Sequence, residues 1–176
     1  SQAEHDKNAS AVLITTSEPL AKAVQQELEK QLALLPREEI ARASIENNGK
    51  IILVPSLQAG IAIANEIAPE HLELCVDDPF AYLGQIRNAG SIFLGKYCPE
   101  ALGDYFSGPN HTLPTSGTAR FSSPLSVDDF VKKSQFSYYT ADALARVAKK
   151  VASFAHKEGL DAHAKSALIR FEEDAQ

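Results

Sequence analysis

The chain has 176 residues and a mass of 19.0 kDa, with 44% hydrophobic and 23% charged residues. This composition predicts a folded chain with one ordinary core and excludes a disordered, low-complexity protein. There are 17 basic and 23 acidic residues, and basic residues adjoin only in pairs, which argues against a surface that follows nucleic-acid phosphates.

The apolar runs are far shorter than the about 20 residues of a membrane-spanning helix, and no secretory signal pattern opens the chain. Cys75 and Cys98 lack CxxC spacing and are interpreted as plain buried or half-buried thiols. A cytoplasmic protein is the simplest reading. The chain contains no methionine, so either its start has been processed or it is part of something longer.

Strands and helices alternate over the first part of the chain. Apolar, β-rich runs predict strands at 11–16, 50–54, 72–76 and 91–94, and helices are expected at 17–32, 37–45, 56–67 and 79–87. Ser17 and Ser56 are candidate N-caps, and Asn47-Asn48-Gly49 predicts a turn. This alternation indicates an α/β fold with a mostly parallel sheet.

In residues 96–125 the apolar residues show no sustained helical or strand periodicity, and Gly, Pro, Asn, Ser and Thr are frequent. Aromatic side chains in this stretch, among them Tyr97, Tyr105 and Phe121, favour a loop anchored on the protein over disorder, and long loops are often functional. Two further helices are expected at 140–157 and 161–173, separated at Gly159.

Histidines recur beside carboxylates or amides along the chain. The pairs are Gln2 and His5, Glu70 and His71, Asp104 and His111, and Glu158 and His163. Imidazole next to a carboxylate suits general acid–base catalysis, and the same atoms suit a borderline metal such as zinc. Each pair also has a plainer reading as a solvated turn, a helix start or an Asx turn, and His156 is read as solvated.

Six segments, taken together, resemble histidinol dehydrogenase, the family that performs the last two steps of histidine biosynthesis. They are SQAEH at 1–5, APEHL at 68–72, NAGSIFLG at 88–95, PEALGDY at 99–105, GPNHTLPT at 108–115 and EGLDAH at 158–163. They follow the family's order and span the chain.

The resemblance implies part of a Rossmann-like lobe with a mostly parallel sheet. Residues 1–125 would be the second half of that α/β lobe and hold most of the active site, and residues 126–176 would be a C-terminal helical dimerisation tail. There is no G-x-G-x-x-G after a strand, so no nucleotide-binding residue is assigned in this chain. The chain is therefore expected to be a C-terminal portion, incomplete without the enzyme's N-terminal half.

The resemblance also implies the site residues. A zinc ion would be held by Gln2, His5, Asp104 and His163, with His163 completing the neighbour's site in a homodimer. Glu70 and His71 match the acid–base pair. Substrate contacts would come from the zinc ligands together with Glu70, His111 and Glu158.

The implied reaction oxidises L-histidinol through L-histidinaldehyde to L-histidine with two NAD. His71 is suited to accept the hydroxyl proton, Glu70 to activate the water that adds to the aldehyde, and zinc to position the substrate. Two alternatives stay open: a stand-alone zinc-binding or dimerisation module, and a relative with another substrate. The ligand types do not rank zinc against manganese or cobalt.

Overall fold

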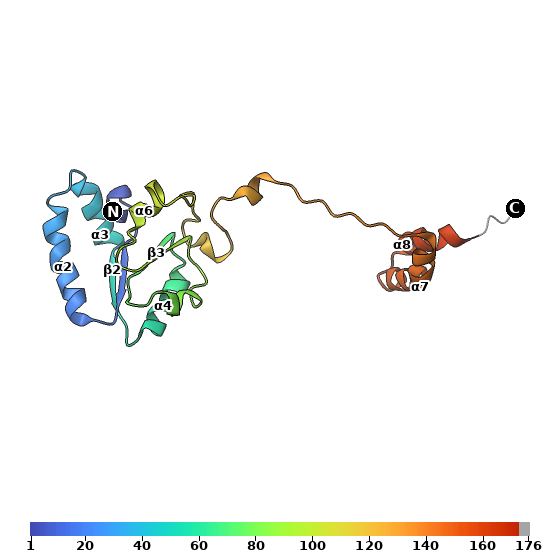
Figure 1. Ribbon diagram of the computed structural model, residues 1–176, viewed down its shortest axis with the longest axis horizontal. Helices are drawn as coiled ribbons and strands as arrows, with labels where there is room; N and C mark the ends of the chain where they lie inside the picture. Colours follow the sequence, from blue (N-terminus) through green and yellow to red (C-terminus); the bar gives the residue numbers. More distant parts are fainter. Residues whose placement is uncertain (173–176) are drawn as a thin grey trace. The chain divides into compact units, whose positions relative to one another are not determined.

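The structure is a computed structural model that describes residues 1–172, and it divides into two compact units, with the division between Val131 and Lys132. This division lies a few residues beyond the expected boundary at 125. The first unit contains α1 (Gln2–His5), β1 (Val12–Thr15), α2 (Glu18–Leu32), α3 (Glu38–Asn48), β2 (Lys50–Leu53), α4 (Leu57–Ile67), β3 (His71–Leu74), α5 (Phe80–Leu83), β4 (Ser91–Leu94), α6 (Glu100–Tyr105) and two 3-10 turns, Thr118–Arg120 and Val127–Phe130. The second contains α7 (Ala141–Lys157), α8 (Asp161–Leu168) and the 3-10 turn Ile169–Phe171 (Figure 1).

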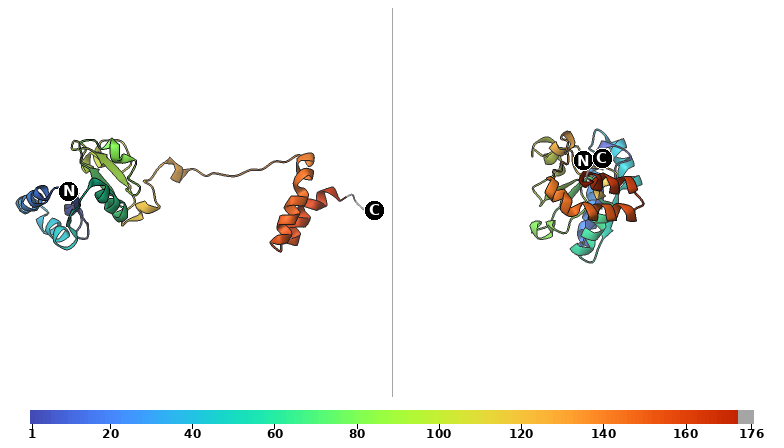
Figure 2. Two further views of the ribbon diagram at one scale, coloured as in Figure 1. Left: turned by 90° about the horizontal axis from the view of Figure 1, so that it is seen from below. Right: turned by 90° about the vertical axis from the view of Figure 1, so that its right-hand side faces the viewer.

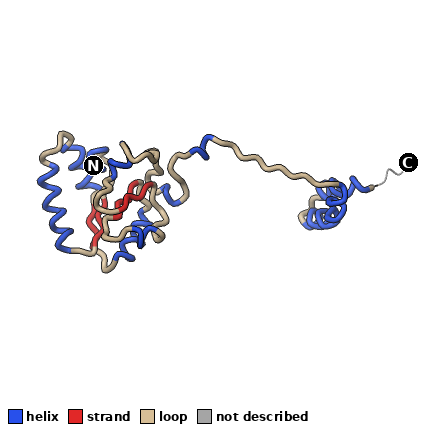
Figure 3. The backbone as a smooth tube through the Cα atoms, in the orientation of Figure 1, coloured by secondary structure: helices blue, strands red, loops and turns tan. Residues whose placement is uncertain are grey.

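All four predicted strands are present, and their pairing is parallel as expected. β1 pairs with β2, with Val12 opposite Lys50, and β3 pairs with β4, with His71 opposite Ser91. Among residues 1–172 these pairs are two separate two-stranded sheets, where one mostly parallel sheet was predicted (Figure 3). The α/β class is thus confirmed, and the Rossmann-like lobe stays a prediction.

The predicted N-caps are confirmed. The backbone N–H groups of Leu20 and Ala59 donate to the hydroxyls of Ser17 and Ser56, at 3.3 and 3.2 Å, and start α2 and α4. Thr140 caps α7 in the same way, accepting from the N–H of Ala143 at 3.2 Å. These bonds satisfy backbone donors that a helix start leaves without partners.

Four predictions of helices and turns need correction. The turn expected at Asn47 is the last turn of α3, which ends at Asn48 with Gly49 as its C-cap, and the helix expected at 79–87 covers only Phe80–Leu83. The stretch without a period contains α6, which is too short to show a helical period in sequence. The last helix ends at Leu168 and continues as a 3-10 turn, and its expected end at Glu173 lies outside the described residues.

Each unit has its own small core. In the first, Ala3 on α1 is buried with Leu32 and Ala41, and the fully buried Ser44 donates its hydroxyl to the carbonyl of Ala9 at 2.8 Å. In the second, alanines of α7 and α8 are buried against each other and let the two helices approach closely (Figure 2). Within residues 1–172, no helix combines the length and hydrophobicity needed to cross a bilayer.

Candidate functional site

The site begins where α4 turns into β3. Ala68 adopts a left-handed conformation with φ 52° at the end of α4, and Pro69 then directs the chain into the strand. The N–H groups of Gly90 and Ser91 donate to the carbonyls of Pro69 and Glu70, at 2.9 and 2.8 Å. These bonds hold Glu70 at the start of the β3–β4 pair.

Gly90 is required for this arrangement. A Cβ atom at this position would lie 2.5 Å from the carbonyl oxygen of Glu70 and 3.2 Å from Cδ of Pro114. Real Cβ atoms do not approach backbone oxygens this closely, so the glycine lets the start of β4 run directly beside Glu70.

His71 is the first residue of β3, and its imidazole is largely buried. Its side chain is 14% exposed and lies beside Phe93 of β4, with ring centroids 6.0 Å apart. Both ring nitrogens are buried without a hydrogen-bond partner. Such orphaned polar atoms are rare and costly in folded proteins, which makes them a signature of a site built for chemistry.

Two carboxylates of α6 face this imidazole. Glu100 and Asp104 are four residues apart and therefore share one side of the helix. Glu100 Oε1 and Asp104 Oδ1 each lie 3.8 Å from His71 Nε2, beyond hydrogen-bond distance. The facing ligand atoms of these three residues all lie within 4.8 Å of one another, so the group can hold a divalent cation.

Gly103 allows α6 to lie against the sheet. A Cβ atom here would be 2.5 Å from Cε1 of Phe93, whose side chain is buried. The helix can therefore approach β4 closely only with glycine at this position. The contact sets the distance from which Glu100 and Asp104 face His71.

α1 joins the same region. Ser1 donates its hydroxyl to Glu100 Oε2 at 2.7 Å, and Arg37 donates to the carbonyl of His5 at 3.4 Å. Gln2 and His5 are three residues apart on this single turn, so they share a side of it. The structure thus places the helix that carries two predicted zinc ligands next to the helix that carries Asp104.

The donor chemistry of Gln2, His5 and Asp104 fits zinc, because amide oxygen, imidazole nitrogen and carboxylate oxygen are all ligands that this borderline metal accepts. Within residues 1–172, His71, Glu100 and Asp104 are the one group of three His, Cys, Asp or Glu residues that lie close enough together to bind a metal ion. His5 does not belong to this group. Glu100 was missed by sequence reasoning. Its spacing of four from Asp104 in PEALGDY was the available signal.

His111 is exposed in the loop after α6. Just before it in the loop, Asn110 Oδ1 accepts from the N–H of Thr112 at 2.6 Å, an Asx turn of the plain kind considered from the sequence. Arg120 ties the end of the loop to α4 by donating to the carbonyls of Gly117, at 2.9 Å, and Glu66. The contact of His111 with substrate stays a prediction.

Glu158 and His163 belong to the second unit. Glu158 caps α7, and both side chains are exposed around the corner between α7 and α8. His156 is exposed to solvent, as predicted, and across this corner its Nδ1 atom lies 2.8 Å from Asp161 Oδ1.

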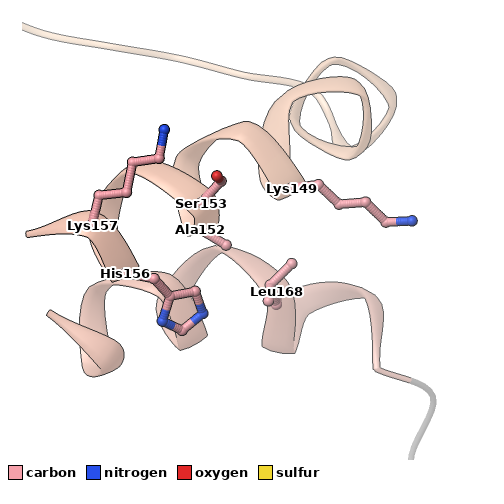
Figure 4. A pocket seen from close by; sticks show the side chains of 6 residues that line it. All are labelled: Lys149, Ala152, Ser153, His156, Lys157 and Leu168. Carbon is pink, nitrogen blue, oxygen red and sulfur yellow. The ribbon is translucent and has the colours of Figure 1, made fainter. Parts of the chain in front are cut away.

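A shallow hollow lies between α7 and the end of α8. Figure 4 shows its lining, with the lysine side chains extending outward. The lining residues are Lys149, Ala152, Ser153, His156, Lys157 and Leu168. No predicted site residue is among them.

Both cysteines are free thiols, as predicted; Cys98 is half-buried, but Cys75 is exposed where a buried or half-buried thiol was expected. Partial burial raises the pKa of the Cys75 thiol, and the nearby charge of Glu73 adds to this effect, with Glu73 Oε2 3.9 Å from Sγ. The other oxygen of Glu73 accepts the backbone N–H of Glu100 at 2.8 Å. Glu73 therefore fastens the start of α6 to β3.

Comparisons with known proteins agree on one family. A family model described as histidinol dehydrogenase matches residues 1–171. A histidinol dehydrogenase of Bacillus cereus is 60% identical over 174 residues, and one of Listeria monocytogenes is 59% identical over the same length. The crystal structure of histidinol dehydrogenase from Elizabethkingia anophelis superposes with a TM-score of 0.89 at 37% identity, covering 97% of this chain.

The chain is much shorter than these relatives. The matches to the two curated relatives cover 99% of this chain but only 41% of each relative, and the match to the crystallised protein covers 39% of that chain. That the matched portion is the C-terminal one stays a prediction.

Proposed function

Since the chain belongs to the histidinol dehydrogenase family, we propose that it is the portion of such an enzyme that holds most of the active site, and that the whole enzyme oxidises L-histidinol through L-histidinaldehyde to L-histidine. The observation that carries the proposal is the buried imidazole of His71, with two unpaired nitrogens, facing the carboxylates of Glu100 and Asp104.

His71 acts as the base. Its nitrogens have no protein partner, so one of them is available to accept the hydroxyl proton of the alcohol in the first step and of the aldehyde hydrate in the second. Burial beside Phe93 shields the imidazole from solvent, and the carboxylates of Glu100 and Asp104 each lie 3.8 Å from its Nε2 atom.

Glu70 directly precedes the base and is half-buried. It takes the proton from the water that adds to the aldehyde, which forms the hydrate needed for the second oxidation. Its backbone carbonyl accepts a hydrogen bond from the N–H of Ser91, so Glu70 and His71 lie at the start of β3, where this strand pairs with β4.

Zinc would be held by Gln2, His5, Asp104 and His163, the last supplied by the neighbouring subunit of a homodimer. When bound there, the metal would position the substrate through its amino and imidazole nitrogens, and two NAD molecules would each accept one hydride. His111 and Glu158 would contact the substrate. Asp104 lies beside His71, so a substrate held at Asp104 is within reach of the base.

The remainder of the enzyme is needed for activity. No NAD-binding residue is assigned here, and β2 leaves Ile51 and Leu53 38% and 52% exposed on a sheet of only two strands. Two-stranded sheets are marginal by themselves. The exposed strand is therefore proposed to be covered by the rest of the lobe in a cytoplasmic enzyme.

A chimeric enzyme tests this function. In it, the chain replaces the matching 174 residues of the Bacillus cereus relative. We expect two NADH per L-histidinol consumed, loss of activity with a chelator, and no activity from the isolated chain.

The variant His71→Asn should lower kcat at least about 100-fold with zinc retained, and Glu27→Gln on the exposed side of α2 serves as the control. A folded chimera that binds zinc without oxidising histidinol would favour the binding-module alternative.

A further inference from the structure

Glu100 of α6 contacts residues of two other elements, α1 and β3. Its Oε2 accepts the hydroxyl of Ser1 at 2.7 Å, its backbone N–H donates to Glu73 Oε1 at 2.8 Å, and its Oε1 faces His71 Nε2 at 3.8 Å. It therefore connects α1 and β3 to the helix on which it lies. Its side chain is only 17% exposed, so these positions are restricted by packing.

The connection with α1 matters because the proposed metal ligands are divided between two short helices. Gln2 and His5 lie on α1, a single turn, and Asp104 lies on α6. A helix of one turn does not hold its own position in water, so α1 depends on its contacts. Among residues 1–172, the hydrogen bond from the Ser1 hydroxyl to the Glu100 carboxylate is the side-chain hydrogen bond that joins α1 to α6.

We propose that Glu100 is a positioning residue of the metal site, which keeps Gln2 and His5 within reach of the metal held by Asp104. This inference rests on the proposed function. In this proposal Glu100 acts through the Ser1 hydrogen bond and is not one of the four residues proposed to hold zinc. Partners of this kind around a metal site typically change affinity by about 10- to 100-fold when they are removed.

The test measures zinc affinity by competition with a chromophoric chelator, using the chimeric enzyme. Glu100→Ala should weaken zinc binding by about 10- to 100-fold. Glu100→Gln keeps an oxygen that accepts from Ser1 and should recover most of the affinity. Ser1→Ala should weaken binding as Glu100→Ala does, and Ser1→Thr, which keeps the hydroxyl, should not. Glu27→Ala, on exposed α2, is the matched control.

The double variant separates positioning from general stability. If the two residues act through one hydrogen bond, Ser1→Ala combined with Glu100→Ala should weaken zinc binding no more than either change alone. Additive losses, or a Glu100→Ala enzyme that binds zinc as tightly as the parent, would overturn the inference. If instead Glu100→Gln loses affinity as Glu100→Ala does, the carboxylate charge and not the hydrogen bond is responsible, and the inference is wrong. A parent enzyme that binds no zinc would reject the proposed metal site itself.

Discussion

The Nε2 atom of His71 lies 3.8 Å from Oδ1 of Asp104, so the proposed base and a proposed metal ligand share one small region between β3 and α6. They are far apart in the sequence, at positions 71 and 104. The relationship depends on two glycines that let backbone and side chains approach closely, and these give the first two predictions.

Gly103→Ala should displace α6 from the sheet. The new methyl group would overlap the ring of Phe93, which is buried and cannot move freely. Overpacking of this kind costs about 1–3 kcal/mol. Thermal unfolding of the chimeric enzyme should show a lower Tm, with weaker zinc binding. Gly84→Ala is the control, because nothing lies within 4 Å of its added Cβ and its φ of −65° suits alanine. Equal Tm values for both variants would contradict the packing argument.

Gly90→Ala should move Glu70. Its Cβ would lie 2.5 Å from the Glu70 carbonyl, so either the β3–β4 pairing opens or the strand start shifts. Because a displacement of about 1 Å at a reacting group can cost about 100-fold in rate, kcat should fall sharply while zinc stays bound. Steady-state kinetics and metal content measure the two effects. A variant with the parent kcat would show that the carbonyl contact is relieved without moving the acid–base pair.

Asn65→Ala should loosen the segment before β4. The side-chain oxygen of Asn65 accepts from the backbone N–H groups of Arg87 and Asn88, at 2.6 and 3.2 Å, and its amide donates to the carbonyl of Gln85 at 2.9 Å. Leaving such groups unpaired costs about 1–3 kcal/mol. Hydrogen exchange followed by mass spectrometry should be faster at residues 85–90.

Asn65→Asp is the matched variant, since it keeps the accepting oxygen but replaces the amide that donates to Gln85 with a second, negatively charged carboxylate oxygen. The exchange of the Arg87 and Asn88 amides should then stay close to that of the parent. Equally fast exchange in both variants would show that the bond to Gln85 holds the segment.

Cys75 should react slowly with alkylating reagents near neutral pH. Partial burial, and then the charge of Glu73, raise the pKa of the Cys75 thiol, so the reactive thiolate is scarce until the pH exceeds the ordinary thiol value of about 8.5. The pH dependence of alkylation, followed by peptide mass spectrometry in a Cys98→Ser background, gives the midpoint. Glu73→Gln should move the midpoint only part of the way down, because burial remains. A midpoint below that of a free thiol would contradict this account.

Much of the local structure was predictable. The hydroxyl caps at Ser17 and Ser56, the four short strands and their parallel pairing follow from residue type and alternation, because capping and β-propensity depend on neighbours in sequence. α6 was not predictable in this way, since a six-residue helix has too few turns to show a period.

By itself, the sequence determined the α/β class, the candidate residues and, through its motifs, the family. Only the tertiary structure decided that Glu100 joins Asp104 at His71, that Ser1 reaches Glu100, and that the strands form two separate pairs. The first of these relationships depends on how closely α6 packs on β4, because that distance decides where the side chains of Glu100 and Asp104 lie. That distance is set by the fit of Gly103 against Phe93, a contact between residues whose spacing in sequence carries no signal.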